Sequence, residues 1–419
     1  MTNRQWFTIH SWVGFAFAGL LLLICATGVL ATLSYEIQYV SAAKYRALTE
    51  RDGPVAWAEL EQNLAAEYPA SHVLGAQVHG QHYLAGEARL MTPNGFQFVY
   101  FDPASGQLLG VGEWGQVSRY LRDIHMYLSM GTTGKYIVTL TSLLLLASLV
   151  TSFYVYRKWW RGFLSNPGGL SWRKRAEWSG WHKWLGLWAW WFVALMAITG
   201  LWYLAEQFMF SNNIQHYPKA PQLQHTEAQK AGARALSLSE LIASAQQARP
   251  DMDITGFFYP HGYDQPMSFV GQNGTTLVRD RANRVYVDPL SGRILGTQYA
   301  QDLALLARIS DTADPLHFGN FASGTVSGLT LKLVYAVFGL MLTGLVAGGM
   351  RMHYLRTQRK QPNSAKWLGI TGCASLALSV VALVYTTLTF AEYSSTSTSL
   401  SPQLGTIPAT VLSKNRLQQ

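Results

Sequence analysis

The stretch "WFTIHSWVGF" at residues 6–15 opens the chain, and a related stretch, "SGWHKWLGLW", returns at residues 179–188. Each places a histidine four residues before a glycine, as His10 with Gly14 and His182 with Gly186, and each leads into a long apolar run. Residues four apart lie on the same face of a helix. The repeat therefore predicts two related membrane helices that each begin with a functional histidine.

Composition also favours a membrane protein. Charged residues make up only 13% of the 419 residues, whereas about 25% is typical of soluble domains. The two cysteines, Cys25 and Cys373, both lie inside apolar runs, which excludes a disulfide framework or a CxxC metal site. The sequence also lacks Walker A, GxGxxG, GxSxG and HExxH motifs, so we expect no nucleotide or flavin site.

Five segments have the roughly 20 apolar residues that a membrane span needs, at residues 12–34, 135–156, 184–205, 328–350 and 367–390. The first is too long for a signal-peptide core, so we interpret it as an uncleaved anchor. The chain then divides into spans at 1–34, 134–156, 184–205, 328–350 and 367–390, outer domains at 35–133 and 206–327, basic loops at 157–183 and 351–366, and a flexible tail at 391–419.

The two short loops fix the expected orientation. Residues 157–183 and 351–366 are rich in Lys and Arg and contain a single acidic residue, Glu177. The positive-inside rule places such loops in the cytoplasm. We therefore expect a multi-pass protein with a cytoplasmic N-terminus and both large connections outside.

The outer connections also repeat each other. "FVYFDPASGQLLG" at residues 98–110 matches "RVYVDPLSGRILG" at residues 284–296, and the shared Asp-Pro-x-Ser-Gly core predicts a hairpin turn. An amphipathic helix is expected upstream of each, at residues 56–68 and 237–249. The predicted fold is an α-helical integral membrane protein, with a four-helix core from a tandem 2+2 duplication, a fifth span and two small α+β outer domains.

Five of the eleven histidines have systematic positions. His10, His182 and His353 lie at the predicted inner ends of spans, and His125 and His317 lie just before the outer starts of spans. Glycine one turn from His10, His182 and His353 leaves flat space beside an imidazole, as a porphyrin needs. Two levels of histidine favour b-type haem held by imidazole over a bare metal ion, which would need converging carboxylates. The alternative is that these are ordinary interfacial histidines.

Several motifs together resemble the PepSY-associated transmembrane proteins. They are "FTIHSWVG", "IHMYLSMGTTGKYIV", "GWHKWLGLWAWWFVALMAITGLWY" and "DPLHFGNFASG", and the likeness covers about residues 1–360. Within this family the chain is most similar to the FoxB-like inner-membrane siderophore reductases of Gram-negative bacteria.

The resemblance implies PepSY-type periplasmic domains and haem b, probably two groups, bound by His10, His125, His182, His317 and His353. His125 and His317 would form the outer pair, and His353 with His182 or His10 would form the inner one. It also implies transfer of single electrons across the inner membrane, from a cytoplasmic or quinol donor to ferric siderophores in the periplasm, with release of Fe(II).

Three other functions remain open from the sequence. One is a non-enzymatic, membrane-anchored PepSY module that binds or regulates a partner. Another is a haem reductase with a different periplasmic acceptor. The third, a transporter, is disfavoured because the spans carry almost no charge beyond Lys332. No catalytic residue and no nucleic-acid partner is predicted.

Overall fold

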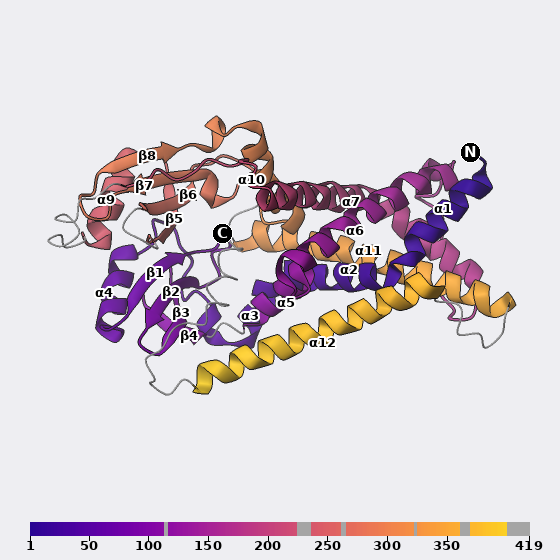
Figure 1. Cartoon of the computed structure of the whole chain (residues 1–419), viewed down its shortest axis with the longest axis horizontal. Helices are drawn as coiled ribbons and strands as arrows, with labels where there is room; N and C mark the ends of the chain where they lie inside the picture. The colour runs from indigo at the N-terminus through magenta and orange to yellow at the C-terminus, as the bar shows by residue number, and fades with distance from the viewer. Residues whose placement is uncertain (113–115, 224–235, 261–264, 322–324, 361–368, 400–419) are drawn as a thin grey trace. The chain divides into compact units, whose positions relative to one another are not determined.

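The computed structural model describes residues 1–419 except 113–115, 224–235, 261–264, 322–324, 361–368 and 400–419. The chain forms two compact units (Figure 1). The membrane unit comprises Met1–Ser34, Ser118–Asn212 and Lys332–Phe390, and the sheet unit comprises Tyr35–Val117, Asn213–Leu331 and Ala391–Gln419.

Long apolar helices make up most of the membrane unit. Within the described residues, four are long and apolar enough to cross a bilayer: Gly131–Val155, Arg175–Ser211, Val326–Lys360 and Gly369–Glu392. They belong to α6 (Gly131–Val155), α7 (Arg175–Ser211), α11 (Thr325–Lys360) and α12 (Gly369–Ser399). These helices correspond to the predicted second to fifth spans, and the chain is a multi-pass membrane protein.

The predicted first span is broken. It consists of α1 (Asn3–Ala16) and α2 (Ala18–Thr32), which meet at Phe17 with a bend of 65°. The first N–H groups of a helix lack acceptors within that helix. Here the Leu20 N–H donates to the Ser375 hydroxyl of α12 at 2.8 Å, in a buried position. Thus α12 supplies an acceptor that the break had removed.

Close packing accompanies this hydrogen bond. A Cβ atom added to Gly19 would lie 3.1 Å from the backbone nitrogen of Leu376 and 3.2 Å from the Ser375 hydroxyl. Small residues permit such close approach between membrane helices. The helix α12 continues to Ser399, into the segment that was predicted to be a flexible tail from residue 391. The remainder of that tail, 400–419, lies outside the described residues.

Buried hydroxyl groups in these helices bond to their own backbone. Thr139, Thr151, Thr199, Ser379 and Thr386 are all buried, and each donates to the carbonyl oxygen four residues earlier. Such bonds satisfy a polar side chain without a partner on another helix. The helices can therefore carry these polar residues through an apolar environment.

The sheet unit contains one antiparallel sheet of eight strands in the order β4-β3-β2-β1-β5-β6-β7-β8. The strands are β1 (His72–Gln77), β2 (Gly86–Thr92), β3 (Gly95–Phe101), β4 (Leu108–Gly112), β5 (Asp253–Phe258), β6 (Met267–Gln272), β7 (Asn283–Val287) and β8 (Ile294–Gln298). The helical segments are α3 (Ser34–Ser41), η1 (Ala43–Tyr45), α4 (Trp57–Glu67), α9 (Leu238–Ala248), η3 (Asp280–Ala282), η4 (Ala300–Asp302) and α10 (Leu305–Phe318). Two further short elements of the described residues are α5 (Val117–Tyr127) and η2 (Trp159–Arg161).

One hydrophobic core lies on one face of the sheet and includes strands from both halves of the sequence. Alternate strand residues point to the same face, and those on one face pack with α4 and α9, the two helices predicted at 56–68 and 237–249. The core includes Leu60, Ala76, Ala88, Val99, Leu241, Phe257, Phe269 and Val285. The two helices thus cover a single continuous apolar surface.

Both predicted hairpins are confirmed. The Asp102 carboxylate accepts hydrogen bonds from the backbone and hydroxyl of Ser105 between β3 and β4. The Asp288 carboxylate accepts the corresponding hydroxyl bond from Ser291 between β7 and β8. Gly106 and Gly292 adopt φ values of 69° and 71°, which glycine takes up without steric cost. Local turn chemistry therefore fixes these connections.

The two outer segments are not separate domains, which corrects the prediction. Strands β1 and β5 pair directly and join both halves into one sheet. The indole N–H of Trp57 donates to the Ile254 carbonyl at 3.2 Å, and Arg51 binds the Asp253 carboxylate through two nitrogens at 2.8 and 3.0 Å. Pairing removes two strand edges that would otherwise expose unpaired backbone groups.

Candidate functional site

His10 and His182 lie together at one end of the membrane unit. Their ring centroids are 6.4 Å apart and the ring planes are inclined by 72°. His10 Nδ1 lies 3.1 Å from the Ser148 carbonyl and 3.0 Å from the Thr151 hydroxyl of α6. His182 Nδ1 lies 3.0 Å from the Leu345 carbonyl of α11. A carbonyl can only accept, so Nδ1 of each ring carries the proton and Nε2 keeps its lone pair.

The glycines one turn away give these histidines room. A Cβ atom at Gly14 would meet no atom within 4 Å, and one at Gly186 would make an ordinary contact of 3.5 Å with Leu345. On α11, Cβ atoms at Gly348 and Gly349 would lie 3.8 Å from the His182 ring. The expectation of open space is met at Gly14, while the other glycines face neighbouring side chains.

His353 belongs to the same unit but has different surroundings. Its ring stacks on Phe15 of α1, with centroids 3.6 Å apart and planes inclined by 13°. The preference for His353 that came from the sequence stays a prediction.

The imidazole of His125 packs tightly against α2. Its Nδ1 lies 3.0 Å from the Ile24 carbonyl and 3.4 Å from the Thr27 hydroxyl. A Cβ atom at Gly28 would lie only 2.9 Å from His125 Cε1, closer than real contacts allow. Glycine at this position is therefore what lets the imidazole of α5 rest against α2.

Burial keeps His125 neutral at ordinary pH. Desolvation lowers the pKa of His125 to about 4, with a smaller lowering from Arg122, and the bond to Ile24 opposes both. Neutral imidazole is the form that binds metals. His125 thus has the protonation state and the fixed orientation of an imidazole ligand.

His317 lies near the end of α10 in the sheet unit, with its ring centroid 5.4 Å from that of Phe318. Because His125 belongs to the membrane unit and His317 to the sheet unit, their pairing stays a prediction. The helix that carries His317 has a support of its own, described next.

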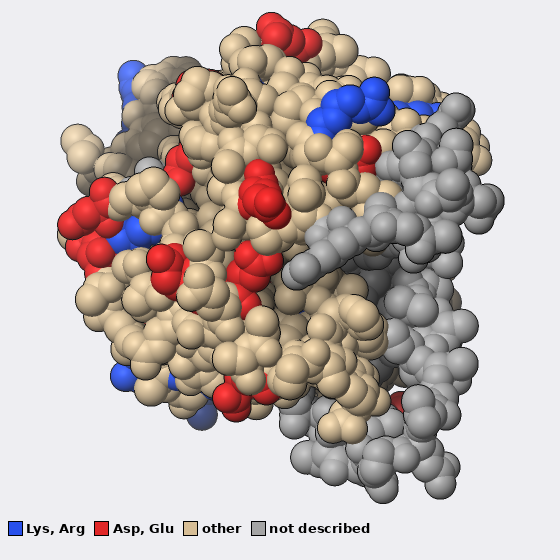
Figure 2. All heavy atoms as spheres, turned by 90° about the vertical axis from the view of Figure 1, so that its left-hand side faces the viewer, with Lys and Arg blue, Asp and Glu red and all other residues tan. Residues whose placement is uncertain are grey.

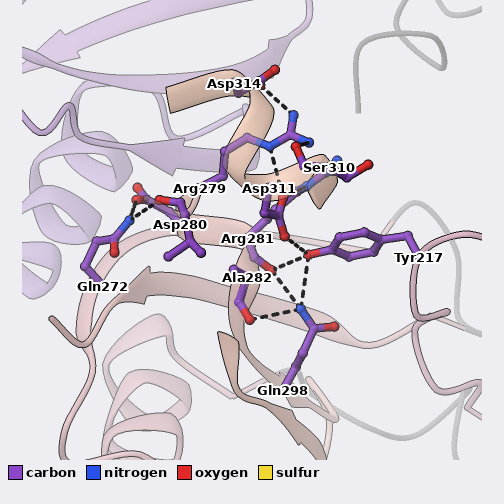
Figure 3. A network of polar contacts seen from close by, with 11 residues as sticks. Tyr217, Gln272, Arg279, Asp280, Arg281, Ala282, Gln298, Ser310, Asp311 and Asp314 are labelled. Atoms are coloured by element: carbon purple, nitrogen blue, oxygen red, sulfur yellow. Dashed lines mark hydrogen bonds and ion pairs between the residues drawn. The ribbon is translucent and has the colours of Figure 1, made fainter. Parts of the chain in front are cut away.

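A buried network of charges holds α10 in the sheet unit (Figure 3). The Asp311 carboxylate, fully buried, lies 3.0 Å from Arg279 Nε and 2.8 Å from Arg281 Nε, and accepts a 2.6 Å bond from the Tyr217 hydroxyl. Arg279 also binds Asp314 at 2.6 Å. Two arginines thus balance two aspartates, and they fix the turn of α10 that precedes His317.

Comparison with known proteins gives one family. The family described as "PepSY-associated TM region" matches residues 7–356 of the chain. The chain belongs to this family. A comparison with curated proteins gives no match.

All five predicted histidines lie inside the matched region of this PepSY-associated protein, whereas α12 lies beyond it. A Thr-Gly pair occurs in both halves of the sequence. Thr27-Gly28 follows His10 at the same spacing as Thr199-Gly200 follows His182. Helix α7 is unbroken, and a rise of about 1.5 Å per residue places Thr199 roughly 25 Å along it from His182. His182 and the Thr-Gly motif therefore lie at two levels, about a bilayer apart.

The residues of this family member fit a haem group. Metal-binding histidines typically donate their second ring nitrogen to a carbonyl or carboxylate, as His10, His125 and His182 do here. The ring centroids of His10 and His182 lie 6.4 Å apart, so both imidazoles could bind one group. In the described part of the chain, no group of three or more His, Cys, Asp or Glu side chains could hold a bare metal ion.

The sequence did not reveal the residues that orient the histidines. The carbonyls of Ile24, Ser148 and Leu345 carry no signal in their side chains, because any residue supplies a carbonyl. Gly28 had a signal: the Thr-Gly pair recurs at Thr199-Gly200, where a Cβ atom on Gly200 would lie 2.2 Å from the Ser142 hydroxyl. In both helices the glycine marks close approach, although the partner differs.

Proposed function

We propose that this chain is a haem-binding oxidoreductase of the inner membrane, most similar to the FoxB-like siderophore reductases. It would pass electrons across the bilayer, reduce ferric siderophores in the periplasm and release Fe(II). The observation that carries the proposal is that three of the five predicted histidines are held through Nδ1, and that two of these, His10 and His182, have ring centroids 6.4 Å apart. Catalytic residues in contact with the siderophore remain unassigned.

The chain's own residues would do four things. His10 and His182 would hold one haem b, and His125 would hold a second together with a ligand such as His317. The carbonyls of Ser148 and Leu345 orient the first pair. When bound, haem supplies one-electron transfer at a potential set by its ligands and burial. The close packing of His125 against α2 would exclude water from that side of the imidazole.

Charge distribution supports an orientation with the His10 end in the cytoplasm. The exposed Arg157, Lys158, Arg161, Arg173, Lys174 and Arg175 follow α6 and begin α7, in the predicted basic loop near His182. Figure 2 views the sheet unit from the left-hand side of Figure 1, and Asp and Glu side chains are spread over this face. Basic loops stay in the cytoplasm, which would leave the sheet unit, with its two PepSY-like halves from a tandem duplication, in the periplasm.

The electron donor would bind at the cytoplasmic end, as a quinol or a reduced protein. The acceptor would be an oxygen-donor ferric chelate, which binds the hard Fe(III) ion much more tightly than Fe(II). Reduction by one electron therefore weakens the complex and releases the metal. The protein breaks no covalent bond in this step.

An absorption spectrum and a pyridine haemochrome assay of the detergent-purified protein test the proposal. We expect a low-spin b-type spectrum and two haems per chain. His182→Ala and His125→Ala should each remove one haem, whereas His72→Ala, at an exposed position on β1, should remove none. Ferric siderophore added to the dithionite-reduced protein should then reoxidise it.

The outcomes separate the alternatives. A chain purified without haem from haem-supplied cells would contradict the reductase and leave a PepSY binding or regulatory module. Haem that is reoxidised only by another periplasmic acceptor would keep the oxidoreductase and change its substrate. If His353→Ala removes a haem while His10→Ala does not, the inner pair is His182 with His353.

A further inference from the structure

Helix α12 lies outside the family match and carries none of the five histidines, yet it contacts both elements that form the His125 site. Figure 1 shows it in yellow. Its Ser375 hydroxyl accepts the Leu20 N–H at 2.8 Å, in the first turn of α2. Seven residues further along, Ala382 packs in one core cluster with Leu20, Ile24 and Leu128.

These contacts reach His125 through the backbone. Ile24 packs its side chain against the α12 cluster and offers its carbonyl to His125 Nδ1. Leu128, in the same cluster, follows directly after α5, the helix that carries His125. The part of α2 that contacts His125 therefore has the imidazole on one side and α12 on the other.

The far end of α12 contacts α5 itself. The Tyr120 hydroxyl lies 3.1 Å from the Thr387 hydroxyl, and its ring lies edge-on to Phe390 with centroids 5.3 Å apart. Helix α12 thus contacts both α5, which carries His125, and α2, whose Ile24 carbonyl accepts the hydrogen bond from His125.

We infer that α12 is a positioning helix for the His125 site, and that Ser375 is its main polar contact. By accepting the Leu20 N–H it holds the first turn of α2 at the break, so that Ile24, Thr27 and Gly28 stay in register with the imidazole. The positions of His10 and His182 do not depend on α12, because the carbonyl groups that these two histidines contact lie on α6 and α11.

The test compares Ser375→Ala with Ser379→Ala in the full-length protein. Ser379 lies one turn away on α12, is also buried, and donates only to the Ser375 carbonyl of its own helix. Gly19→Ala is a second, independent variant, because its Cβ would push against the α12 backbone. The wild-type protein and the three variants are examined by hydrogen exchange at residues 17–24 and by carbethoxylation of individual histidines with diethyl pyrocarbonate.

Loss of one buried hydrogen bond should raise exchange at Leu20 by roughly fivefold. Ser375→Ala and Gly19→Ala should also speed modification of His125 several-fold while leaving His182 at its original rate, and Ser379→Ala should change neither. Equal rates in Ser375→Ala and Ser379→Ala would overturn the inference. So would a matching increase at His182, which would mean general loosening. Neither readout requires haem, so the result stands whether or not the proposed reductase activity is found.

Discussion

His125 and His317 occupy similar places in the two halves of the sequence, each shortly before a membrane helix, but their helices are supported differently. The imidazole of His125 is held by close packing on α2, with one carbonyl bond and a glycine beneath the ring. The helix of His317 is held by a buried network of ion pairs in the sheet unit. The two halves thus keep the position of the histidine and change the force that fixes it.

The sequences of the two helices explain the difference. With His125 and His317 aligned, Arg119 and Arg122 of α5 stand where α10 has Asp311 and Asp314. At these two positions α10 therefore carries the acidic partners of Arg279 and Arg281, whereas α5 carries basic residues. Ion pairs resist displacement strongly but depend on every member, whereas close packing depends on the size of each side chain.

The largest effect should follow from Asp311→Asn. Removing one member of a buried ion network costs about 3–5 kcal/mol, and we expect the lower end because both arginines are about one-quarter exposed. Exchange of α10 amides should then rise by roughly a hundredfold, with α5 unchanged. Asp314→Asn, which loses a single pair whose two side chains are each about one-quarter exposed, is the matched control with a clearly smaller effect. Equal protection in both variants would mean that the network does not hold α10.

The next effect is expected from Gly28→Ala. The added methyl group would overlap His125, at an overpacking cost of about 1–3 kcal/mol, offset by a gain of about 1 kcal/mol in helix propensity. We expect faster exchange in α5 and loss of the haem that depends on His125. Gly14→Ala should leave exchange in α5 unchanged, because no described side chain lies within 4 Å of the new atom. The packing account fails if the two variants behave alike.

A smaller effect should follow from Tyr120→Phe, which removes the hydroxyl facing Thr387 and keeps the ring contact with Phe390. A net hydrogen bond contributes about 0.5–1.5 kcal/mol, and the lower end applies to this exposed pair. Exchange in α5 should increase about twofold. Tyr154→Phe provides a control, since the described residues offer its hydroxyl no hydrogen bond. An unchanged α5 would show that α12 holds this helix through apolar contacts alone.

The smallest effect concerns pH. Burial raises the pKa of Asp280, and hydrogen bonds from Thr255 and Gln272 oppose the shift. A raised folded-state pKa means that the folded protein binds the proton more tightly than the unfolded chain, so this group favours folding at low pH and loses that contribution as pH rises through its folded-state pKa. Protection of η3 should therefore increase modestly on mild acidification, and Asp280→Asn should abolish the change. A decrease in the wild-type protein would contradict the sign.

Features that depend on neighbouring residues could be predicted from the sequence. Apolar length gave the spans, and alternation with Asp-Pro-x-Ser-Gly turns gave both hairpins, because a turn is decided within a few residues. The places of His10, His125, His182, His317 and His353 along the chain followed from repeats. Family membership was also readable from motifs, and the match over residues 7–356 confirms it.

Features that depend on distant partners were decided only by the tertiary structure. The sequence could not show that β1 pairs with β5, because the residues of an edge strand do not indicate which distant strand will pair with it. Nor could it show the break at Phe17, which α12 stabilises from more than 350 residues away in the sequence. The first and third spans carry the same histidine and Thr-Gly spacing, yet the first is broken at Phe17 and the third is one continuous helix. Local sequence sets what each segment can form, and packing against distant segments selects among those forms.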